Sequence, residues 1–341
     1  AGTPRAFIGT ATNFINFDGT NLQVKVNRSN LMLYEAVVDA AGYGDYSTIA
    51  AAVAAGKKSI FVRNGNYTIS SAIVLGTAQS ETVITGESTQ GVIISLNSAS
   101  NVDVFDINGL AKNIIIQNLT INGNRSNQTS NGIGIYFSST TTDPSSCVFR
   151  NLIFKLCRQA LKMANSVSTG YSIEICNNLF DSNGVLATPL STMYLASGTA
   201  SIHDNVISNN TASCVEIYLA GGYTIEANTI IYTPHHAIWI RKGGSNIISN
   251  NVILSASQAT DNTYSGIFLD VVAGNGCYRN IVSGNIMNLD PGAGIKPAYG
   301  IRESIDDGNY NIFANNIMRG AGTANISING ANSLNDNNII A

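Results

Sequence analysis

The sequence predicts an all-β fold, a right-handed single-stranded parallel β-helix with an N-terminal capping helix. The first observation behind this prediction is an Asn step, an Asn followed by aliphatic residues, that recurs along the chain. The spacing between steps has a minimum of 22–23 residues and grows by insertions, a pattern typical of solenoids. The steps contain Asn118, Asn151, Asn178, Asn205, Asn228, Asn251, Asn285, Asn316 and Asn338.

The second observation is a short alternating segment that follows each of the first eight Asn steps by 9 or by 14–15 residues. Alternation of apolar and polar residues indicates a half-buried strand and excludes a helical repeat. A unit this short buries its apolar face only by stacking on copies of itself, which places like residues above like residues. The segments are 132–136, 160–164, 192–196, 214–218, 237–241, 266–270, 300–304 and 325–329.

The region before the repeat divides into two parts. Residues 1–34 carry no Asn step, and a hairpin around Gly19 is expected there, so we interpret them as an N-terminal module or linker. Residues 35–341 are the predicted β-helix. Its first element is a helix within 35–60, capped by Asp45 or Ser47 and ended by Gly56, with Ile49 and Val53 on one face. This helix would cover the open end of the solenoid.

Composition excludes several classes of function. The net charge of −3 argues against a nucleic-acid partner, and no run of apolar residues is long enough to cross a membrane. No signal peptide is recognised. The five cysteines form no CxxC pair, and we expect free thiols near the core. No capping element is visible after the last Asn step, so we expect another subunit or a further domain to cover that end.

The outward residues of stacked strands form a ladder along one face of a solenoid. The alternation predicts two rows of such residues, rich in aromatic and charged groups although only 11% of the chain is charged. Aromatic rings stack on sugars and charged groups bind hydroxyls and carboxylates, so the ladder suits a polysaccharide. The predicted rows are Gly134, Lys162, Tyr194, Glu216, Trp239, Phe268 and Arg302, and Tyr136, Ala164, Ala196, Tyr218, Arg241, Asp270 and Ser304.

Insertions locate the candidate site within this ladder. The units at Asn178, Asn251 and Asn285 carry longer corners than the two units between them, so long corners are expected to wall a floor. We expect the floor to contain Glu216, Tyr218, Trp239 and Arg241, with His235 and His236 at the adjacent corner. Adjacent histidines point in different directions, so at most one of them should face the groove.

Two segments resemble known proteins. Residues 42–70, GYGDYSTIAAAVAAGKKSIFVRNGNYTIS, are similar to the entry of pectate-lyase-like β-helix proteins, a superfamily that includes phage tailspikes and mannuronan C-5 epimerases. Asn64 stands where those proteins have Pro. HHAIWIRKGG, residues 235–244, is similar to a rung of mannuronan epimerases and alginate lyases, although the acidic residue of the epimerase signature is absent. The resemblance implies a secreted or virion-associated protein and, by analogy with tailspikes, a trimer.

Three functions compete, all with an acidic polysaccharide as partner. Lyase-type β-elimination, or C5 epimerisation, needs a cation on the uronate carboxylate, a base and an acid. We assign these roles to Arg241, to His235 or His236, and to Tyr218. A glycoside hydrolase would use Glu216 and Asp270, and a non-catalytic adhesin would use the ladder only as a platform. Further substrate-binding candidates are Lys162, Tyr194, Glu216, Trp239, Lys242, Phe268, Asp270 and Arg302.

No cofactor is expected from the sequence. The positions of His, Cys and Asp show no metal-ligand spacing, which argues against a zinc site. Scattered carboxylates leave a Ca²⁺ site open.

Overall fold

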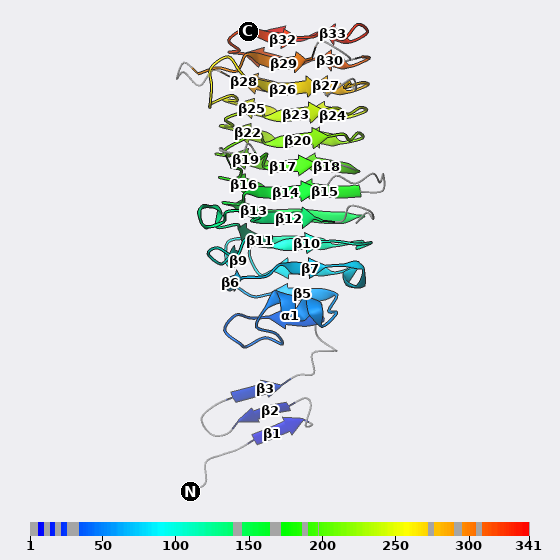
Figure 1. Ribbon diagram of the computed structural model, residues 1–341. Helices are drawn as coiled ribbons and strands as arrows, with labels where there is room; N and C mark the ends of the chain where they lie inside the picture. Colours follow the sequence, from blue (N-terminus) through cyan, green and yellow to red (C-terminus); the bar gives the residue numbers. More distant parts are fainter. Residues whose placement is uncertain are drawn as a thin grey trace.

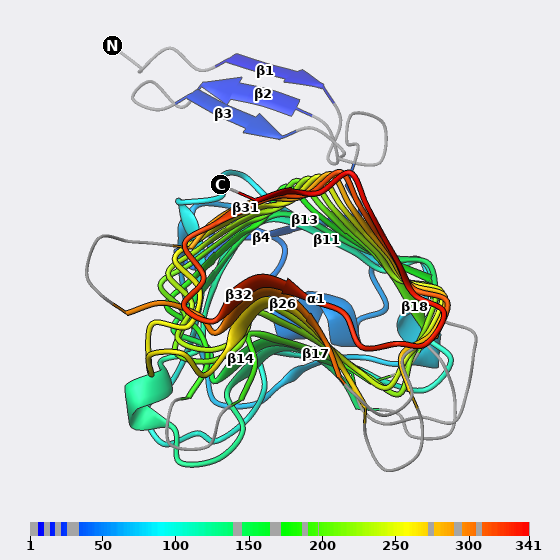
Figure 2. The same cartoon turned by 90° about the horizontal axis from the view of Figure 1, so that it is seen from above.

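The chain forms a column of stacked coils, in which each coil lies directly above the previous one (Figure 1). The computed structural model describes residues 6–9, 14–17, 22–25, 34–138, 145–163, 172–185, 190–196, 198–271, 276–289, 295–304 and 309–340. All strand pairs of the column are parallel, which confirms the predicted β-helix. Seen along its axis, the column shows coils that superpose around a common core (Figure 2).

One face of the column is a ten-stranded parallel sheet. Its strands correspond to the alternating segments of the sequence, and the first two precede them. In order they are β7 (Ile73–Leu75), β10 (Phe105–Ile107), β12 (Ile133–Phe137), β14 (Gln159–Met163), β17 (Met193–Leu195), β20 (Val215–Tyr218), β23 (Ile238–Arg241), β26 (Ser265–Asp270), β29 (Tyr299–Glu303) and β32 (Ala324–Ser327).

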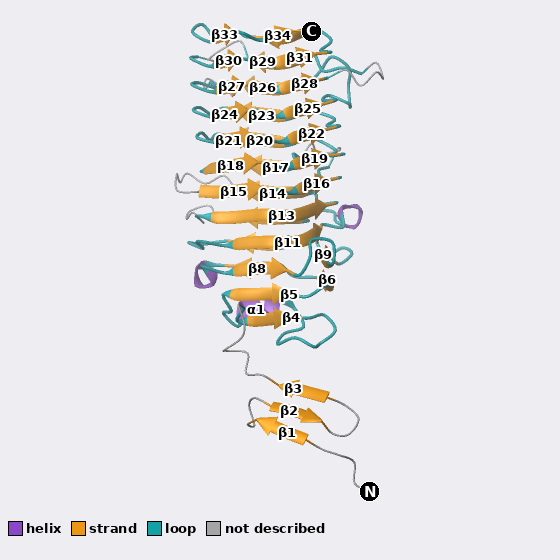
Figure 3. Ribbon diagram, turned by 180° about the vertical axis from the view of Figure 1, so that it is seen from behind, coloured by secondary structure: helices purple, strands orange, loops and turns teal. Residues whose placement is uncertain are grey.

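The other faces belong to a 21-stranded parallel sheet (Figure 3). β11 and β13 continue through a corner and join two faces into one sheet, which is not a closed barrel in the described part of the chain. The strands are β4 (Ala36–Val38), β5 (Ser59–Val62), β6 (Gly65–Ile69), β8 (Val83–Gly86), β9 (Val92–Leu96), β11 (Ile115–Asn122), β13 (Cys147–Lys155), β15 (Ser172–Cys176), β16 (Leu179–Asp181), β18 (Thr199–His203), β19 (Val206–Ser208), β21 (Thr224–Glu226), β22 (Thr229–Ile231), β24 (Ile247–Ser249), β25 (Val252–Leu254), β27 (Ile281–Ser283), β28 (Ile286–Asn288), β30 (Ile312–Ala314), β31 (Ile317–Arg319), β33 (Leu334–Asp336) and β34 (Ile339–Ile340).

The N-terminal elements agree with the prediction except for one cap. Helix α1 (Ile49–Ala54) packs on β4, β5 and β7 and buries Ile49 and Val53. Its N-cap is Thr48, whose hydroxyl accepts from the Ala51 N–H at 3.2 Å, so the predicted caps Asp45 and Ser47 are wrong. The Asp45 carboxylate instead accepts from the Val37 N–H at 2.8 Å. Two short 3₁₀ helices, η2 (Thr77–Gln79) and η3 (Arg125–Asn127), lie in corners.

Residues before the column form a sheet of their own. β1 (Ala6–Gly9), β2 (Phe14–Phe17) and β3 (Leu22–Lys25) pair in antiparallel order, so the predicted hairpin exists. Gly19 lies outside the described residues. The division of the chain at residue 34 stays a prediction.

A continuous ladder of buried Asn side chains holds one corner of the column together. In the middle of the ladder, Asn228 Oδ1 accepts from the Asn205 backbone N–H at 3.1 Å and from its Nδ2 at 2.9 Å. Asn228 Nδ2 in turn donates to the Ile202 carbonyl at 2.8 Å. The amides therefore satisfy backbone groups that a tight corner would leave without partners. The ladder runs through Asn178, Asn205, Asn228, Asn251, Asn285, Asn316 and Asn338.

The first two predicted steps do not belong to this ladder. Asn118 and Asn151 adopt left-handed backbone conformations, with φ of 59° and 52°, one residue before the ladder position. Leu152 occupies that position, and its N–H donates to Asn178 Oδ1 at 2.9 Å. The prediction was displaced by one residue because Asn is also favoured at the left-handed corner.

The core of the column is apolar and closely packed. Phe154 and Phe180 stack on consecutive coils with their ring centroids 4.7 Å apart. The five cysteines are free and buried, as expected. Burial raises the pKa of the Cys157 and Cys214 thiols to about 12, so these groups are inert in the core.

Candidate functional site

The register of the ten-stranded sheet aligns one outward side chain from each coil. We call this row the outer ladder: Asp106, Tyr136, Lys162, Tyr194, Glu216, Trp239, Phe268, Arg302 and Ser327. Every member from Lys162 to Arg302 was predicted for this row. Gly134 was not a correct member, because it is buried and a Cβ there would lie 2.9 Å from the Phe154 ring. Tyr136 takes its place.

A second row lies beside the first and contains Tyr218, Arg241 and Asp270 in register. The Arg241 guanidinium carbon lies 4.4 Å from the centroid of Trp239 and 5.1 Å from that of Tyr218. Tyr218 also stacks on Tyr194, at 6.1 Å between ring centroids. The predicted floor residues therefore lie together on one face: Arg241 makes one cation–π contact with Trp239 of its own strand and another with Tyr218 of the preceding coil.

An ion pair fixes Arg241 in this position. Arg241 Nη1 donates to Glu216 Oε1 at 2.8 Å, and the Ser191 hydroxyl donates to Glu216 Oε2. The Glu216 side chain is only 6% exposed, against 31% for Arg241. The Glu216 carboxylate therefore lies buried beneath the other side chains of the ladder, and it offsets part of the positive charge of Arg241.

Asp270 occupies a different environment. Trp239 Nε1 donates to Asp270 Oδ2 at 3.2 Å. Desolvation raises the pKa of Asp270 above its ordinary value, although the Trp239 hydrogen bond and the charges of Arg241 and Arg302 act in the opposite direction. The Asp270 carboxyl group therefore keeps its proton to a higher pH than an ordinary aspartate does.

The two adjacent histidines diverge, as expected. His236 is buried against Trp239 and Phe268, with ring centroids 5.2 and 5.0 Å away, and its Nδ1 accepts from the Ser265 N–H at 3.0 Å. Burial lowers the pKa of His236 to about 3, and the charges of His235 and Arg302 add to this effect. His236 is therefore neutral and its Nδ1 is already occupied.

His235 keeps more freedom to act on a substrate. It is partly exposed and stacks on Tyr264, with ring centroids 4.3 Å apart. Burial lowers the pKa of His235 below its ordinary value, so the imidazole is neutral near pH 7 and can accept a proton. Tyr264 belongs to the long corner after Asn251, so this insertion contacts His235, while its role as a wall of the site stays a prediction.

The outer ladder continues beyond the floor in both directions. Arg302 lies 5.0 Å from the Phe268 ring centroid and 5.1 Å from that of Tyr299. At the other end, Lys162 Nζ lies 5.1 Å from the Tyr136 ring centroid. Within the described part of the chain neither cation forms an ion pair, so both can meet an anionic ligand.

Unsatisfied polar atoms gather near the floor. Among the described residues, five buried side-chain atoms have no hydrogen-bond partner. Three of them are Thr192 Oγ1, Arg241 Nε and Ser265 Oγ, all on or directly beside the ten-stranded sheet. The other two, Thr82 Oγ1 and Asn210 Nδ2, lie outside the ten-stranded sheet.

A cavity of about 620 Å³ adjoins the floor at the next corner. Lys242 and Arg279 bring positive charge to it, and Tyr278 and Tyr310 bring aromatic surface. Its base requires glycine, because a Cβ at Gly221 would lie 2.1 Å from the Gly244 carbonyl oxygen. Lys242 directly follows Arg241 at the end of β23 and is therefore placed between the second row and this cavity.

Sequence reasoning missed three residues of the floor and its walls: Ser191, Tyr264 and Tyr299. Ser191 and Tyr264 end the long corners that precede β17 and β26, and Tyr299 begins β29. Their position just before an alternating segment was the signal that could have revealed them. The remaining wall segments 186–189 and 290–294 lie outside the described residues.

Comparison with known proteins identifies the fold. No family model matches the sequence, and no curated protein matches it. Among solved structures, the chain is similar to the ORF18 protein of Geobacillus virus E2, with a TM-score of 0.57 and 14% identity over 89% of this chain and 68% of that one. It is also similar to the surface protein and adhesin PfbA of Streptococcus pneumoniae, with a TM-score of 0.53 and 11% identity over 83% and 91%.

A third structure is the A-module of a mannuronan C-5 epimerase from Azotobacter vinelandii, with a TM-score of 0.50 and 15% identity over 84% and 93%. At identities this low the likeness shows the fold alone. The chain has a right-handed parallel β-helix fold. In the described residues, no helix is long and apolar enough to span a membrane.

Proposed function

We propose that this protein acts on an acidic polysaccharide lying along the outer ladder, by lyase-type β-elimination at a uronic acid. The observation that carries the proposal is the convergence of Arg241, Trp239 and Tyr218 on one face, with neutral His235 at the adjacent corner. Such a platform provides rings for sugar stacking and a cation for the uronate carboxylate. Action outside the cell or on a virion belongs to the same proposal.

Each step of the elimination has a candidate residue. Arg241 neutralises the uronate carboxylate, which acidifies the C5–H bond. His235 takes the C5 proton, the electron pair forms the C4–C5 double bond, and the C4–O bond breaks. Tyr218 gives a proton to the departing glycosidic oxygen. His236 is not a candidate for the base, because its Nδ1 already accepts a hydrogen bond from the Ser265 N–H.

The ion pair with Glu216 modifies the role of Arg241. Because Glu216 offsets part of its charge, a further cation of the ladder should contribute to binding of a uronate polymer. Arg302 is the candidate, since it lies over Phe268 without an ion-pair partner in the described residues. It stands two coils beyond Arg241, so we expect it to bind a second uronate, two sugars away if each coil meets one sugar.

A glycoside hydrolase is the second candidate, and a specific observation favours it. The environments of Glu216 and Asp270 differ in the way that an acid and a base require: Glu216 is ion-paired, whereas desolvation raises the pKa of Asp270. In this reaction Asp270 would protonate the leaving oxygen and Glu216 would act as nucleophile or base.

Epimerisation and binding without turnover are the remaining outcomes. One structural neighbour is an epimerase module and another is an adhesin, so the fold is compatible with both. An epimerase would return the proton to C5 from the opposite face, with no bond broken at C4. Trimerisation, expected by analogy, also stays a prediction that sedimentation equilibrium would test.

The discriminating experiment incubates the protein with alginate, pectate and hyaluronan, and follows ultraviolet absorbance of unsaturated uronate together with reducing ends. A rise in both supports the lyase, and a rise in reducing ends alone supports the hydrolase. Retained binding without either rise supports the adhesin, unless NMR shows a changed epimer ratio.

Two variants separate the two leading mechanisms. Arg241→Ala should lower lyase activity by about 10²–10³-fold, the usual loss for a group that stabilises developing charge. Asp270→Asn should leave elimination within a few-fold of wild type, but should lower hydrolysis by about 10²–10⁴-fold. Full activity of the folded Arg241→Ala protein on every substrate would show that the active site does not lie on this face.

A further inference from the structure

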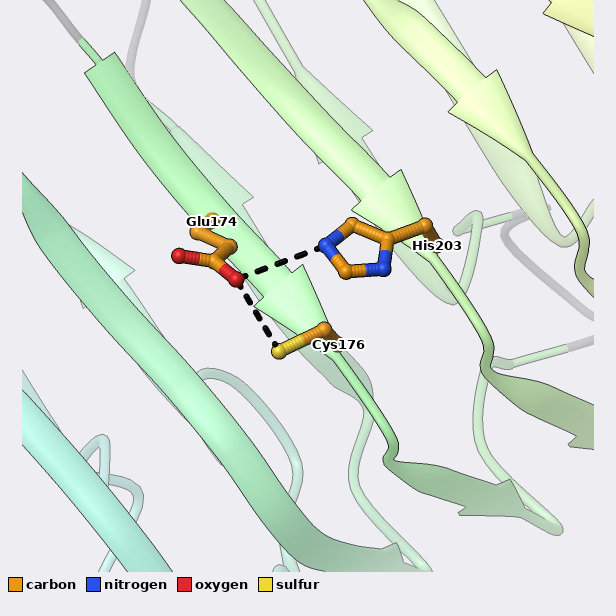
Figure 4. A group of neighbouring side chains, drawn as sticks. All are labelled: Glu174, Cys176 and His203. Carbon is orange, nitrogen blue, oxygen red and sulfur yellow. Dashed lines mark hydrogen bonds and ion pairs between the residues drawn. The ribbon is translucent and has the colours of Figure 1, made fainter.

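A second cluster of reactive side chains lies on the other sheet. Glu174 and Cys176 belong to β15, and His203 belongs to β18 on the next coil (Figure 4). Cys176 and His203 are register partners, and Glu174 is two residues before Cys176, so all three point to the same face. This face belongs to the 21-stranded sheet, whereas the outer ladder belongs to the ten-stranded one.

The three ligand-type atoms converge on one point. Glu174 Oε1 lies 3.4 Å from His203 Nε2 and 3.4 Å from Cys176 Sγ, and all three atoms lie within 4.8 Å of one another. In a tetrahedral zinc site, the bond lengths of the ion place an oxygen and a nitrogen ligand about 3.4 Å apart and an oxygen and a sulfur ligand about 3.6 Å apart. The two separations from the Glu174 oxygen fit this geometry, and His203 Nε2 and Cys176 Sγ lie no more than 4.8 Å apart.

The orientation of the imidazole also fits a metal ligand. His203 Nδ1 lies 2.8 Å from Asp204 Oδ2, so the carboxylate holds the Nδ1 proton and turns Nε2 toward Glu174 and Cys176. A carboxylate on the far nitrogen is the usual support of a zinc-bound histidine, because it fixes the tautomer and raises the basicity of the ligand.

The surroundings leave room for a fourth ligand. Glu174 and His203 line a depression of about 610 Å³, together with hydroxyl groups of Ser172, Ser201 and Thr224. Cys176 is buried beside them, whereas the Glu174 side chain is 46% exposed. Three protein ligands with one position open to solvent are the arrangement of zinc sites that bind water or substrate.

We propose that Glu174, Cys176 and His203 form a binding site for a transition-metal dication, with Zn²⁺ as the best match. Thiolate and imidazole ligands select Zn²⁺ and its neighbours over Ca²⁺ and Mg²⁺, which prefer oxygen ligands only. The sequence did not predict this site, because its ligands come from two coils and stand 27 residues apart between Cys176 and His203. The site is independent of the polysaccharide proposal.

Cobalt substitution tests the proposal directly. The full chain is stripped with a chelator, then titrated with Co²⁺ and, in competition, with Zn²⁺ and Ca²⁺. We expect one Co²⁺ per chain and a thiolate-to-cobalt charge-transfer band that Zn²⁺ removes and Ca²⁺ does not. Zn²⁺ should also raise the thermal unfolding midpoint of the protein.

Matched variants identify the ligands. Cys176→Ser should abolish the charge-transfer band, whereas Cys277→Ser, which removes a buried thiol elsewhere in the column, should leave it unchanged. His203→Gln should weaken Co²⁺ binding at least 100-fold, and Asp204→Asn about 10–100-fold, because Asp204 only supports the ligand. Absence of stoichiometric binding in the wild type, or a band that survives in folded Cys176→Ser, overturns the proposal.

Discussion

The Asn ladder and the outer ladder arise from the same stacking but use it in opposite ways. In the Asn ladder one residue type repeats on every coil, and each side chain satisfies the next, as Asn228 does for Asn205. In the outer ladder the residue changes on every coil, and neighbours such as Trp239 and Phe268 present different chemistry. Repetition stabilises the column, whereas variation provides a surface that can recognise a ligand.

The two ladders also differ in how they treat polar groups. Asn228 and Asn251 are almost fully buried, and each amide has several partners. Arg241, in contrast, keeps a buried Nε–H without a partner in the described residues.

The largest loss of stability is expected when an amide is removed from the middle of the Asn ladder. Asn251→Ala removes the acceptor of the Asn228 N–H, one of the acceptors of the Asn228 amide and a donor to the Ile225 carbonyl. We expect the free energy of unfolding to fall by about 3–5 kcal/mol, measured by urea denaturation. Asn338→Ala, at the exposed end, is the control and should cost about 1–2 kcal/mol. Equal losses would contradict the ladder account.

The pH dependence of stability tests how strongly burial affects His236, the histidine that packs on Trp239. The pKa of His236 is lowered from 6.5 to about 3 in the folded protein, so the unfolded chain binds the extra proton. Its contribution to stability is therefore complete above pH 6.5 and is lost as the pH falls toward 3, by at most about 1.4 kcal/mol per pH unit. Chemical denaturation at several pH values measures this slope.

His236→Asn should reduce that slope, because Asn does not titrate while its amide oxygen can still accept from the Ser265 N–H. His235→Asn is the matched control and should change the slope less, since His235 is only partly buried. If both variants keep the wild-type slope, burial of His236 is not its source.

The outer ladder should affect binding more than stability. Trp239→Ala should weaken polysaccharide binding about tenfold through the lost stacking surface, measured by calorimetry with an unreactive oligosaccharide. The unfolding midpoint should also fall somewhat, because Trp239 packs on His236 and its Nε1 donates to Asp270, so binding is measured at a temperature where the variant is folded. Tyr43→Ala, an exposed aromatic far from the ladder, is the control and should bind like wild type. An unchanged affinity of Trp239→Ala would contradict the proposal that the outer ladder binds polysaccharide.

The smallest effect is expected at the end of the ladder. Lys162→Ala should change the free energy of unfolding by less than about 0.5 kcal/mol, because its cation–π contact with Tyr136 is solvated. Its contribution to binding should appear at low ionic strength and fade as salt is added. A salt-independent loss of affinity would show that Lys162 acts through packing.

Periodicity predicted most of the column, because one-dimensional stacking converts sequence spacing directly into spatial neighbours. It therefore placed Trp239 beside Phe268 and Arg241 beside Tyr218. It failed at Asn118 and Asn151, where the left-handed corner residue imitates the ladder residue. A second buried ladder, Asn246, Asn280 and Asn311, was also missed, although each member precedes a predicted Asn by five residues.

What spacing does not reveal is the direction and burial of individual side chains. Glu216 belongs to the predicted outward row, yet its side chain is only 6% exposed because it lies against Arg241 and Ser191. The Glu174, Cys176 and His203 cluster was missed because its members come from two coils on a face whose alternation carried no aromatic signal. Both errors concern contacts between coils, which depend on rotamers as well as register.

The spacing of about 4.8 Å between coils has a consequence for specificity. It is close to the length of one pyranose unit, so successive sugars of an extended glycan would meet successive side chains of the column. Inserting or deleting one whole coil of 23 residues, the separation of Asn228 and Asn251, would then lengthen or shorten the recognised oligosaccharide by a single monosaccharide. The number of coils would then set the length of the glycan that the column recognises.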